Sequence, residues 1–234
     1  MTAEAPSILY RVSVRELCAF TAKSGDLDLR FTPAPTSAEG QLGHARVAAA
    51  RGPGYQREVP LSRQYRSLEV RGRADGYWPR EQALEEIKTH RGAVTRIPAH
   101  HRALHWAQLK LYGAMLCHQQ GLATLRLRVV YLDLDREQET PFTEDFDAAN
   151  LHHFFDTQAQ RFLDWALQQG AHRLRRNAAM AALDFPYPAM HAGQRGLAEA
   201  VYRRCRDGGA LLAQAPTGIG KTLGTLFPTL KAMP

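Results

Sequence analysis

Three segments of alternating apolar and polar side chains follow one another between residues 58 and 89, and they predict three neighbouring β-strands. The second segment ends at Asp75, and the third carries Glu86 and Lys88. A Gly-Tyr-Trp-Pro sequence at 76–79 suits a hairpin connection between them. Glu86 and Lys88 are two residues apart, so both point to the same face of a strand. The two carboxylates and the ammonium are therefore expected to meet at one edge of a sheet.

A long helix is predicted at 99–120, because apolar side chains recur there at helical spacing and a glycine follows the last turn. Gln108 and Tyr112 are four residues apart on this helix and share one face. Alternation at 125–134 predicts a further strand. A capped helix that begins after Ser13 precedes the first strand. The order helix, three strands, helix, strand gives a compact α/β core.

Other segments carry weaker signals. Pro, Gly and Ser residues in 32–43 indicate a loop, whereas the alanine-rich segment 40–50, which contains His44, favours a helix. Apolar residues at helical spacing in 142–170 predict a helix that continues to Met180.

Prolines in the segment 184–188 stop this helix and place a domain boundary there, with one domain at 1–182 and another at 183–234. Of the formal net charge of +7, residues 171–234 carry +6, with nine Lys/Arg against three Asp/Glu. The first part is nearly neutral, so its affinity for phosphate must come from a local site. A solvated basic face remains an alternative for the arginine-rich run.

The composition is that of a globular protein, with 44% hydrophobic and 23% charged residues. The N-terminal sequence lacks the pattern of a signal peptide, and no run of eighteen apolar residues occurs, so we expect a cytoplasmic protein that does not bind membranes. Cys18, Cys117 and Cys205 are too scattered for a disulfide framework. No Cys or carboxylate lies at ligand spacing beside His100, His101 and His105 at the start of the long helix, so we expect these histidines to face solvent or DNA rather than bind zinc.

Two carboxylates beside an ammonium suit the hydrolysis of a phosphodiester. The carboxylates can hold Mg²⁺ or Mn²⁺ against the scissile phosphate, and the ammonium can orient the attacking water and offset growing negative charge. Asp75, Glu86-x-Lys88 and Gln108-x-x-x-Tyr112, with His44 upstream, resemble the RecB-like branch of the PD-(D/E)XK nucleases. The resemblance covers roughly residues 13–135.

This resemblance implies a restriction-endonuclease-like core, a mixed sheet flanked by helices. It also implies that Asp75 and Glu86 bind the metal ion, that Ile87 contributes its backbone carbonyl, and that Lys88 lies at the attacking water. His44 would be a further ligand for manganese, although a lone histidine is also common outside metal sites. By the same resemblance, Gln108 and Tyr112 orient the lysine or contact the DNA backbone.

The separate motifs are common outside active sites. Glu-x-Lys occurs on many solvated strand faces, and Asp before Gly is frequent in turns. The conjunction of the motifs in this order favours the nuclease interpretation.

A second motif occurs near the end of the chain, at 211–222. We expect a strand there that runs into a phosphate-binding loop, in which backbone N–H groups cradle the phosphates, Lys221 reaches the β- and γ-phosphates and Thr222 binds Mg²⁺. The first position of the motif is Ala215 in place of the usual glycine. Thr217, Gly218 and Gly220 complete the loop.

The upstream sequence 187–195 resembles the adenine-binding segment of XPD/DinG-type superfamily 2 DNA helicases, which implies that Gln194 contacts adenine of ATP. Only twelve residues follow Thr222, so no acidic Walker B strand or second motor lobe is present. We therefore expect an incomplete P-loop helicase segment, whose partners would be the remaining helicase domains of a longer chain.

These features predict a Mg²⁺- or Mn²⁺-dependent nuclease domain of an ATP-dependent DNA helicase-nuclease, acting on single-stranded DNA or single-stranded ends in DNA repair or processing. Two alternatives remain open. One is a nuclease-like DNA-binding module that has lost catalysis and positions a helicase. The other is a nucleotide-binding motor protein with an unrelated N-terminal domain.

Overall fold

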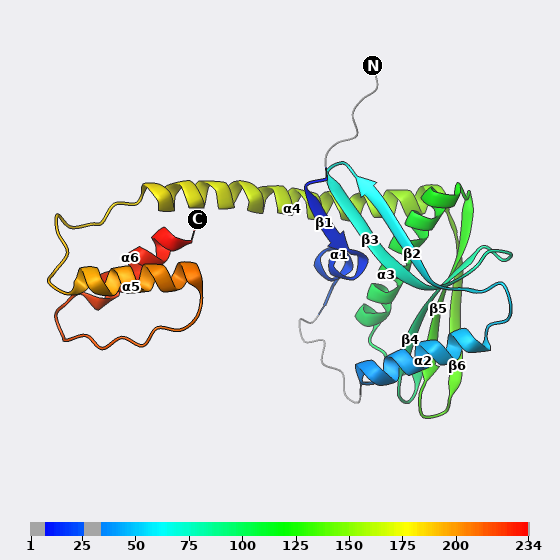
Figure 1. Cartoon of the computed structure of the whole chain (residues 1–234). Helices are drawn as coiled ribbons and strands as arrows, with labels where there is room; N and C mark the ends of the chain where they lie inside the picture. The colour runs from blue at the N-terminus through cyan, green and yellow to red at the C-terminus, as the bar shows by residue number, and fades with distance from the viewer. Residues whose placement is uncertain (1–7, 26–33, 234) are drawn as a thin grey trace, which may run out of the picture. The chain divides into compact units, whose positions relative to one another are not determined.

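A computed structural model describes residues 8–25 and 34–233 (Figure 1). The chain divides into two compact units, Met1–Ala166 (unit 1) and Leu167–Pro234 (unit 2). The division falls inside helix α4, Ala148–Ala182, whose buried residues all belong to unit 1. The helix thus ends at the last residue of the first predicted domain, whereas the compact unit ends sixteen residues earlier.

Unit 1 contains a six-stranded mixed sheet, in agreement with the predicted α/β class. The pairings of β1 with β3 and of β4 with β5 are parallel, and the others are antiparallel. The strands are β1 (Tyr10–Ser13), β2 (Gln56–Tyr65), β3 (Leu68–Trp78), β4 (Ala83–His90), β5 (Thr124–Asp133) and β6 (Gln138–Asp147).

Helices cover both faces of this sheet (Figure 1). On one face, α1 (Val14–Thr21), α3 (Ala99–Gln120) and the first part of α4 bury a large apolar cluster. On the other face, α2 (Ser37–Ala50) packs Val47 against Ile87 and neighbouring side chains of β5. The 3-10 turn η1 (Val94–Arg96) leads into α3.

Along one edge, strand β3 pairs with one strand at its start and with another at its end, and this opens a gap in the sheet. One edge pairs with β2 over most of its length, while the other pairs with β1 at Leu68–Arg71 and with β4 at Gly76–Trp78. Between these stretches, β3 and β4 separate. The Asp75 side chain bridges the opening, because its Oδ2 accepts a hydrogen bond of 2.7 Å from the backbone N–H of Ile87. The gap thus places Asp75 beside the backbone of Ile87, the residue next to Glu86.

Several sequence predictions about unit 1 are confirmed and others are wrong. The Ser13 cap and the Gly121 terminus of α3 occur as expected, with Gly121 at φ 65°. Asp75 does not end its strand, because β3 continues through the predicted hairpin sequence to Trp78. The turn lies at 79–82 instead.

Two segments adopt a different structure from the predicted one. The loop expected at 32–43 is helical from Ser37 onward, because Thr36 and Glu39 form a capping box; residues 32 and 33 lie outside the described part of the chain. The segment 142–147, expected to be helical, belongs to β6. It pairs with β5 along its whole length, and tertiary pairing here overrides the helical spacing of its apolar residues.

Unit 2 consists of the end of α4 and two packed helices, α5 (Gln194–Asp207) and α6 (Lys221–Ala232). The strand expected before the phosphate-binding loop does not form, since 209–216 is irregular and Leu212 is fully exposed. A strand needs a hydrogen-bonding neighbour, and no strand occurs among the described residues of unit 2. Throughout residues 8–25 and 34–233, no helix combines the length and apolar character needed to cross a membrane.

Candidate functional site

The site is centred on Lys88, whose ammonium group is held by two side chains. Its Nζ donates to Glu86 Oε1 at 2.6 Å and to Gln108 Oε1 at 3.4 Å. Glu86 and Lys88 point to the same face of β4, as their spacing predicts, and Gln108 reaches them from α3. Burial acts to lower the pKa of Lys88, but the adjacent Glu86 carboxylate outweighs it and the pKa rises. Lys88 is therefore a fixed cation near neutral pH rather than a base.

Glu86 is the most buried acid at the gap, with 2% of its surface exposed. Burial raises its pKa to about 7, although Lys88 opposes the shift. Its Oε1 is occupied by Lys88, whereas its Oε2 is buried and has no hydrogen-bond partner within residues 8–25 and 34–233. A buried carboxylate oxygen without a partner is costly, and in a native protein it calls for an additional ligand such as an ion or a water.

Asp75 and His44 form the other half of the site. His44 Nδ1 lies 3.3 Å from Asp75 Oδ1, while Asp75 Oδ2 is engaged by the backbone of Ile87. The hydrogen bond with Asp75 raises the pKa of His44, against the effect of burial. Both groups act electrostatically on Glu86. The structure therefore brings His44 and Asp75 into contact, and Glu86 lies on the neighbouring strand β4.

A glycine allows the helix that carries His44 to lie close to the sheet. A Cβ atom on Gly43 would stand 2.4 Å from Thr89 Cγ2 and 3.2 Å from Leu132 Cδ2. Because both neighbours belong to the sheet, any larger residue would push α2 outward. The position of His44 thus depends on the residue that precedes it.

Tyr112 is buried and closes the inner side of the gap. Burial raises the pKa of its hydroxyl, while hydrogen bonds from Gln108 and from the Arg73 backbone act in the opposite direction. A Cβ atom on Gly72 would lie 2.9 Å from the Tyr112 oxygen, so glycine at this position leaves room for the tyrosine side chain. Tyr112 is only 5% exposed, which favours the first of its two implied roles, the orientation of Lys88.

A divalent ion needs several donor atoms close together. Within residues 8–25 and 34–233, no three His, Cys, Asp or Glu side chains are grouped closely enough to hold an ion by themselves. Mg²⁺ usually takes only one or two carboxylates and completes its shell with water and substrate phosphate. Asp75 and the unpartnered Oε2 of Glu86 fit that requirement, and Ile87 lies between them in the gap.

Asp75 also has a structural role that its motif does not reveal. Two substitutions at this position should differ in stability because of it. Asp75→Ala removes the acceptor of the Ile87 N–H, so we expect it to lower the free energy of unfolding by about 1–3 kcal/mol. Asp75→Asn keeps an acceptor oxygen and should cost much less, while removing the negative charge. Urea denaturation of both variants measures the difference. Equal destabilisation of the two would contradict the bridging role.

His105 is not placed as the sequence predicts. Its Nδ1 lies 2.9 Å from the Tyr131 hydroxyl, and burial lowers its pKa to about 3. It therefore faces the interior as a neutral side chain, because the helix turns this position toward β5 rather than toward solvent or DNA.

The loop before α6 contains two glycines in left-handed conformation. Gly218 and Gly220 have φ angles of 84° and 77°, which a side chain would disfavour, and Lys221 is the first helical residue. Lys221 Nζ donates to the carbonyls of Ala215 and Pro216 at 3.2 and 2.9 Å, so the lysine folds back over its own loop. Thr217 lies in this loop and Thr222 follows Lys221 in the first turn.

Gln194 is 2% exposed and ties this loop to the preceding segment. Its Nε2 donates to the Gly220 carbonyl at 2.9 Å, and its Oε1 accepts from the His191 N–H at 3.0 Å. Both ends of the amide are thus engaged within the protein.

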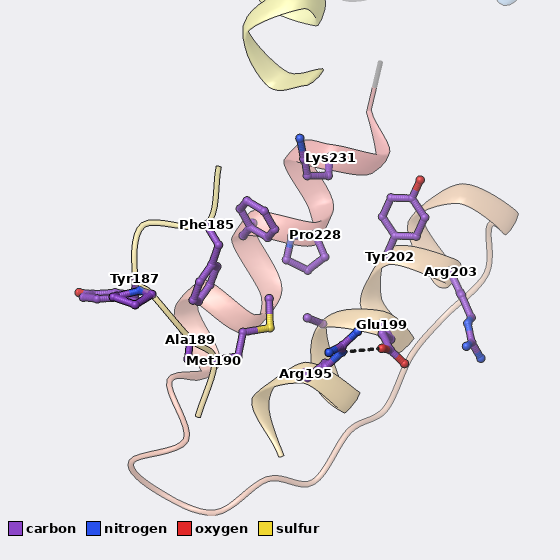
Figure 2. A pocket seen from close by; sticks show the side chains of 13 residues that line it. Phe185, Tyr187, Ala189, Met190, Arg195, Glu199, Tyr202, Arg203, Pro228 and Lys231 are labelled. Atoms are coloured by element: carbon purple, nitrogen blue, oxygen red, sulfur yellow. Dashed lines mark hydrogen bonds and ion pairs between the residues drawn. The ribbon is translucent and has the colours of Figure 1, made fainter. Parts of the chain in front are cut away.

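Unit 2 also contains a cavity of about 800 Å³ beside α5 and α6 (Figure 2). Aromatic and basic side chains gather around it, among them Phe185, Tyr202 and Arg195, the last paired with Glu199 at 3.2 Å. Neither Gln194 nor Lys221 lines it. The cavity and the loop are therefore separate features.

No protein-family model matches the chain, and no curated protein sequence is similar to it. Among solved structures, an alkaline exonuclease from Laribacter hongkongensis superposes with a TM-score of 0.42 and 14% identity, covering 72% of this chain and 93% of its own. A phage-related exonuclease from Haemophilus somnus superposes with a TM-score of 0.38 and 14% identity, covering 67% and 81%.

Proposed function

We propose that unit 1 is a metal-dependent nuclease that hydrolyses phosphodiester bonds of DNA. The observation that carries this proposal is the arrangement at the gap between β3 and β4. There, a lysine kept cationic by Glu86 stands beside a carboxylate oxygen that is buried without a partner, next to the Asp75–His44 pair. Few structural roles require such an arrangement, whereas a phosphate held by a divalent ion does.

In this proposal, Asp75 and Glu86 hold Mg²⁺ or Mn²⁺, with the carbonyl of Ile87, and His44 is the further ligand for Mn²⁺. The ion would supply the polarisation of the phosphate and the activation of water. Lys88 orients the attacking water and offsets the charge on the phosphorane, as its fixed ammonium allows. The oxygen of water forms the new bond to phosphorus and gives up a proton to solvent, while the bond to the leaving oxygen breaks and that oxygen takes up a proton from solvent.

Gln108 and Tyr112 act as positioning residues. Gln108 contacts both Lys88 and Tyr112, and Tyr112 is fixed by the β3 backbone, so together they determine where the ammonium lies. The proposed substrate is DNA that is single-stranded or has single-stranded ends, acted on in repair or processing.

The direct test is cleavage of 5′- and 3′-labelled single-stranded DNA by the wild-type protein. Cleavage should occur with Mg²⁺ or Mn²⁺ and stop when EDTA is added. The competing interpretation is a DNA-binding module without catalysis. It would bind the strands with no cleavage and take up no divalent ion in calorimetry.

For unit 2, we propose that the loop at 215–222 binds the phosphates of ATP as part of a DNA helicase segment, with Gln194 near the adenine. The support is the pair of glycines in left-handed conformation before Lys221. Lys221→Ala is expected to weaken binding of a fluorescent ATP analogue at least about tenfold, because one charge-assisted phosphate contact is lost. Lys231→Ala, in the last turn of the same helix, is the matched control. Equal affinities of wild type and Lys221→Ala would overturn the assignment.

A further inference from the structure

Strand β3 presents a row of side chains on the face opposite to α3. Val70 and Ala74 are fully buried toward the main apolar cluster, so by alternation Arg71, Arg73 and Asp75 lie on the other face. This face is hollowed beside β3 by a cavity of about 750 Å³, whose lining includes both arginines. Asp75 lines a second, smaller cavity with His44. The two arginines therefore continue along the strand from the proposed ion site.

The spacing of this row suits a nucleic-acid backbone. Residues two apart on a strand are separated by roughly 6.7 Å, which is close to the distance between successive phosphates of an extended strand. The row is a single line of cations, so it can follow one backbone, and one backbone is all that a single strand presents. The geometry thus favours a single strand laid along β3.

The positive charges of Arg71 and Arg73 are available to bind phosphate. Within residues 8–25 and 34–233, Arg71 has no ion-pair partner. Arg73 pairs with Glu58 at 2.8 Å, and both side chains are more than half exposed. An exposed pair of this kind contributes little, so a phosphate can replace the carboxylate.

Glu58 occupies an unusual backbone position. It lies on β2 across from Asp75, between the pairs Arg57–Gly76 and Val59–Ala74, and its φ of 53° is in the left-handed region. Glutamate rarely adopts this conformation. The sheet therefore holds an acidic side chain beside Arg73 at the entrance to the ion site.

Building on the proposed nuclease function, we propose that the exposed face of β3 is a phosphate-binding track for a single DNA strand. The ion at Asp75 takes the scissile phosphate, Arg73 the next phosphate and Arg71 the one beyond. Glu58 pairs with Arg73 until the strand arrives, and so weakens the binding of strands that do not displace Glu58. The sequence held a signal for this track, because both arginines alternate with apolar residues in register with Asp75.

The test is binding of a fluorescently labelled single-stranded oligonucleotide to the full chain in EDTA, measured by anisotropy at several salt concentrations. Each phosphate contact with a single strand contributes about 0.7 to the slope of log K against log salt. Arg71→Ala and Arg73→Ala should each reduce the slope by about that amount and raise Kd about fivefold at 0.1 M salt. Glu58→Gln should lower Kd.

Arg136→Ala removes the same charge from an exposed position in the turn between β5 and β6, and it should leave the slope unchanged. The proposed track is wrong if both β3 variants keep the wild-type slope, or if Arg136→Ala reduces the slope by as much as they do. Because EDTA removes the metal ion that cleavage needs, the strand is not cut in this assay. The measured affinity is therefore independent of nuclease activity. A wild type that fails to cleave with Mg²⁺ or Mn²⁺, yet shows the slope changes, would reject the proposed function alone.

Discussion

Replacing Lys88 by alanine is expected to lower the rate of DNA cleavage by about two to three orders of magnitude, the usual effect of removing one preorganised electrostatic contact. Lys88 is held by Glu86 and Gln108, and its pKa is raised, so its positive charge is fixed where negative charge would develop on the phosphate. Water cannot supply an equivalent charge at that point. The loss should appear mainly in kcat, measured with labelled single strands at saturating metal.

The control for this variant is Lys110→Ala. Lys110 lies on α3 with its ammonium 4.9 Å from the Phe146 ring centre, outside the gap. The Lys110→Ala variant should cleave DNA at a rate within about twofold of the wild type, because Lys110 contacts none of the proposed site residues. Circular dichroism of both variants checks that the fold is retained. Cleavage by a folded Lys88→Ala variant at the wild-type rate would reject the assignment of the site.

Addition of Mn²⁺ or Mg²⁺ is expected to raise the melting temperature of unit 1 by roughly 5–10 °C at an ion concentration of about 100 Kd. The reason is the Oε2 atom of Glu86, which is buried without a partner and would gain one in the ion. EDTA should reverse the shift. Glu86→Gln should abolish it, because an amide is a poor ligand for a divalent ion. Differential scanning calorimetry measures both.

The size of this shift should depend on pH. Burial raises the pKa of Glu86 to about 7, above its ordinary value of 4.5. Without metal, Glu86 binds its proton more tightly in the folded than in the unfolded chain, so its contribution to stability is present below pH 4.5 and is lost as the pH rises through about 7. The ion binds only the carboxylate, so each pH unit below 7 should weaken binding about tenfold.

Glu144→Gln is the matched control, since Glu144 is an exposed carboxylate on β6. This variant should show the same ion-induced and pH-dependent shift as the wild type. A shift of equal size in Glu86→Gln would mean that the ion binds elsewhere. The absence of any shift in the wild type would favour the non-catalytic DNA-binding module.

The relation of Glu86 to Lys88 and of Gln108 to Tyr112 was predictable, because strand alternation and helical periodicity are local rules. The tie between Asp75 and Ile87 was not, since it depends on β3 and β4 separating after three paired residues. The alternation of 142–147 was hidden by apolar residues that also fit a helix, and only pairing with β5 decided it.

The loop before α6, proposed to bind phosphates, illustrates the same distinction. Its glycines and the start of α6 follow from the local sequence, because left-handed backbone and helix initiation need no distant partner. The preceding segment has the composition of a strand but forms none, as strand formation depends on a neighbour.

By itself, then, the sequence determined which chemical groups unit 1 can offer and on which faces of their own elements they lie. Only the tertiary structure decided that Glu86 is buried with an oxygen that lacks a partner among the described residues, that Tyr112 is buried, and that Arg71 and Arg73 line an open face. The physical reason is that burial, desolvation and sheet divergence arise from contacts between elements far apart in the chain, whereas side-chain direction within one element is fixed by its own repeat.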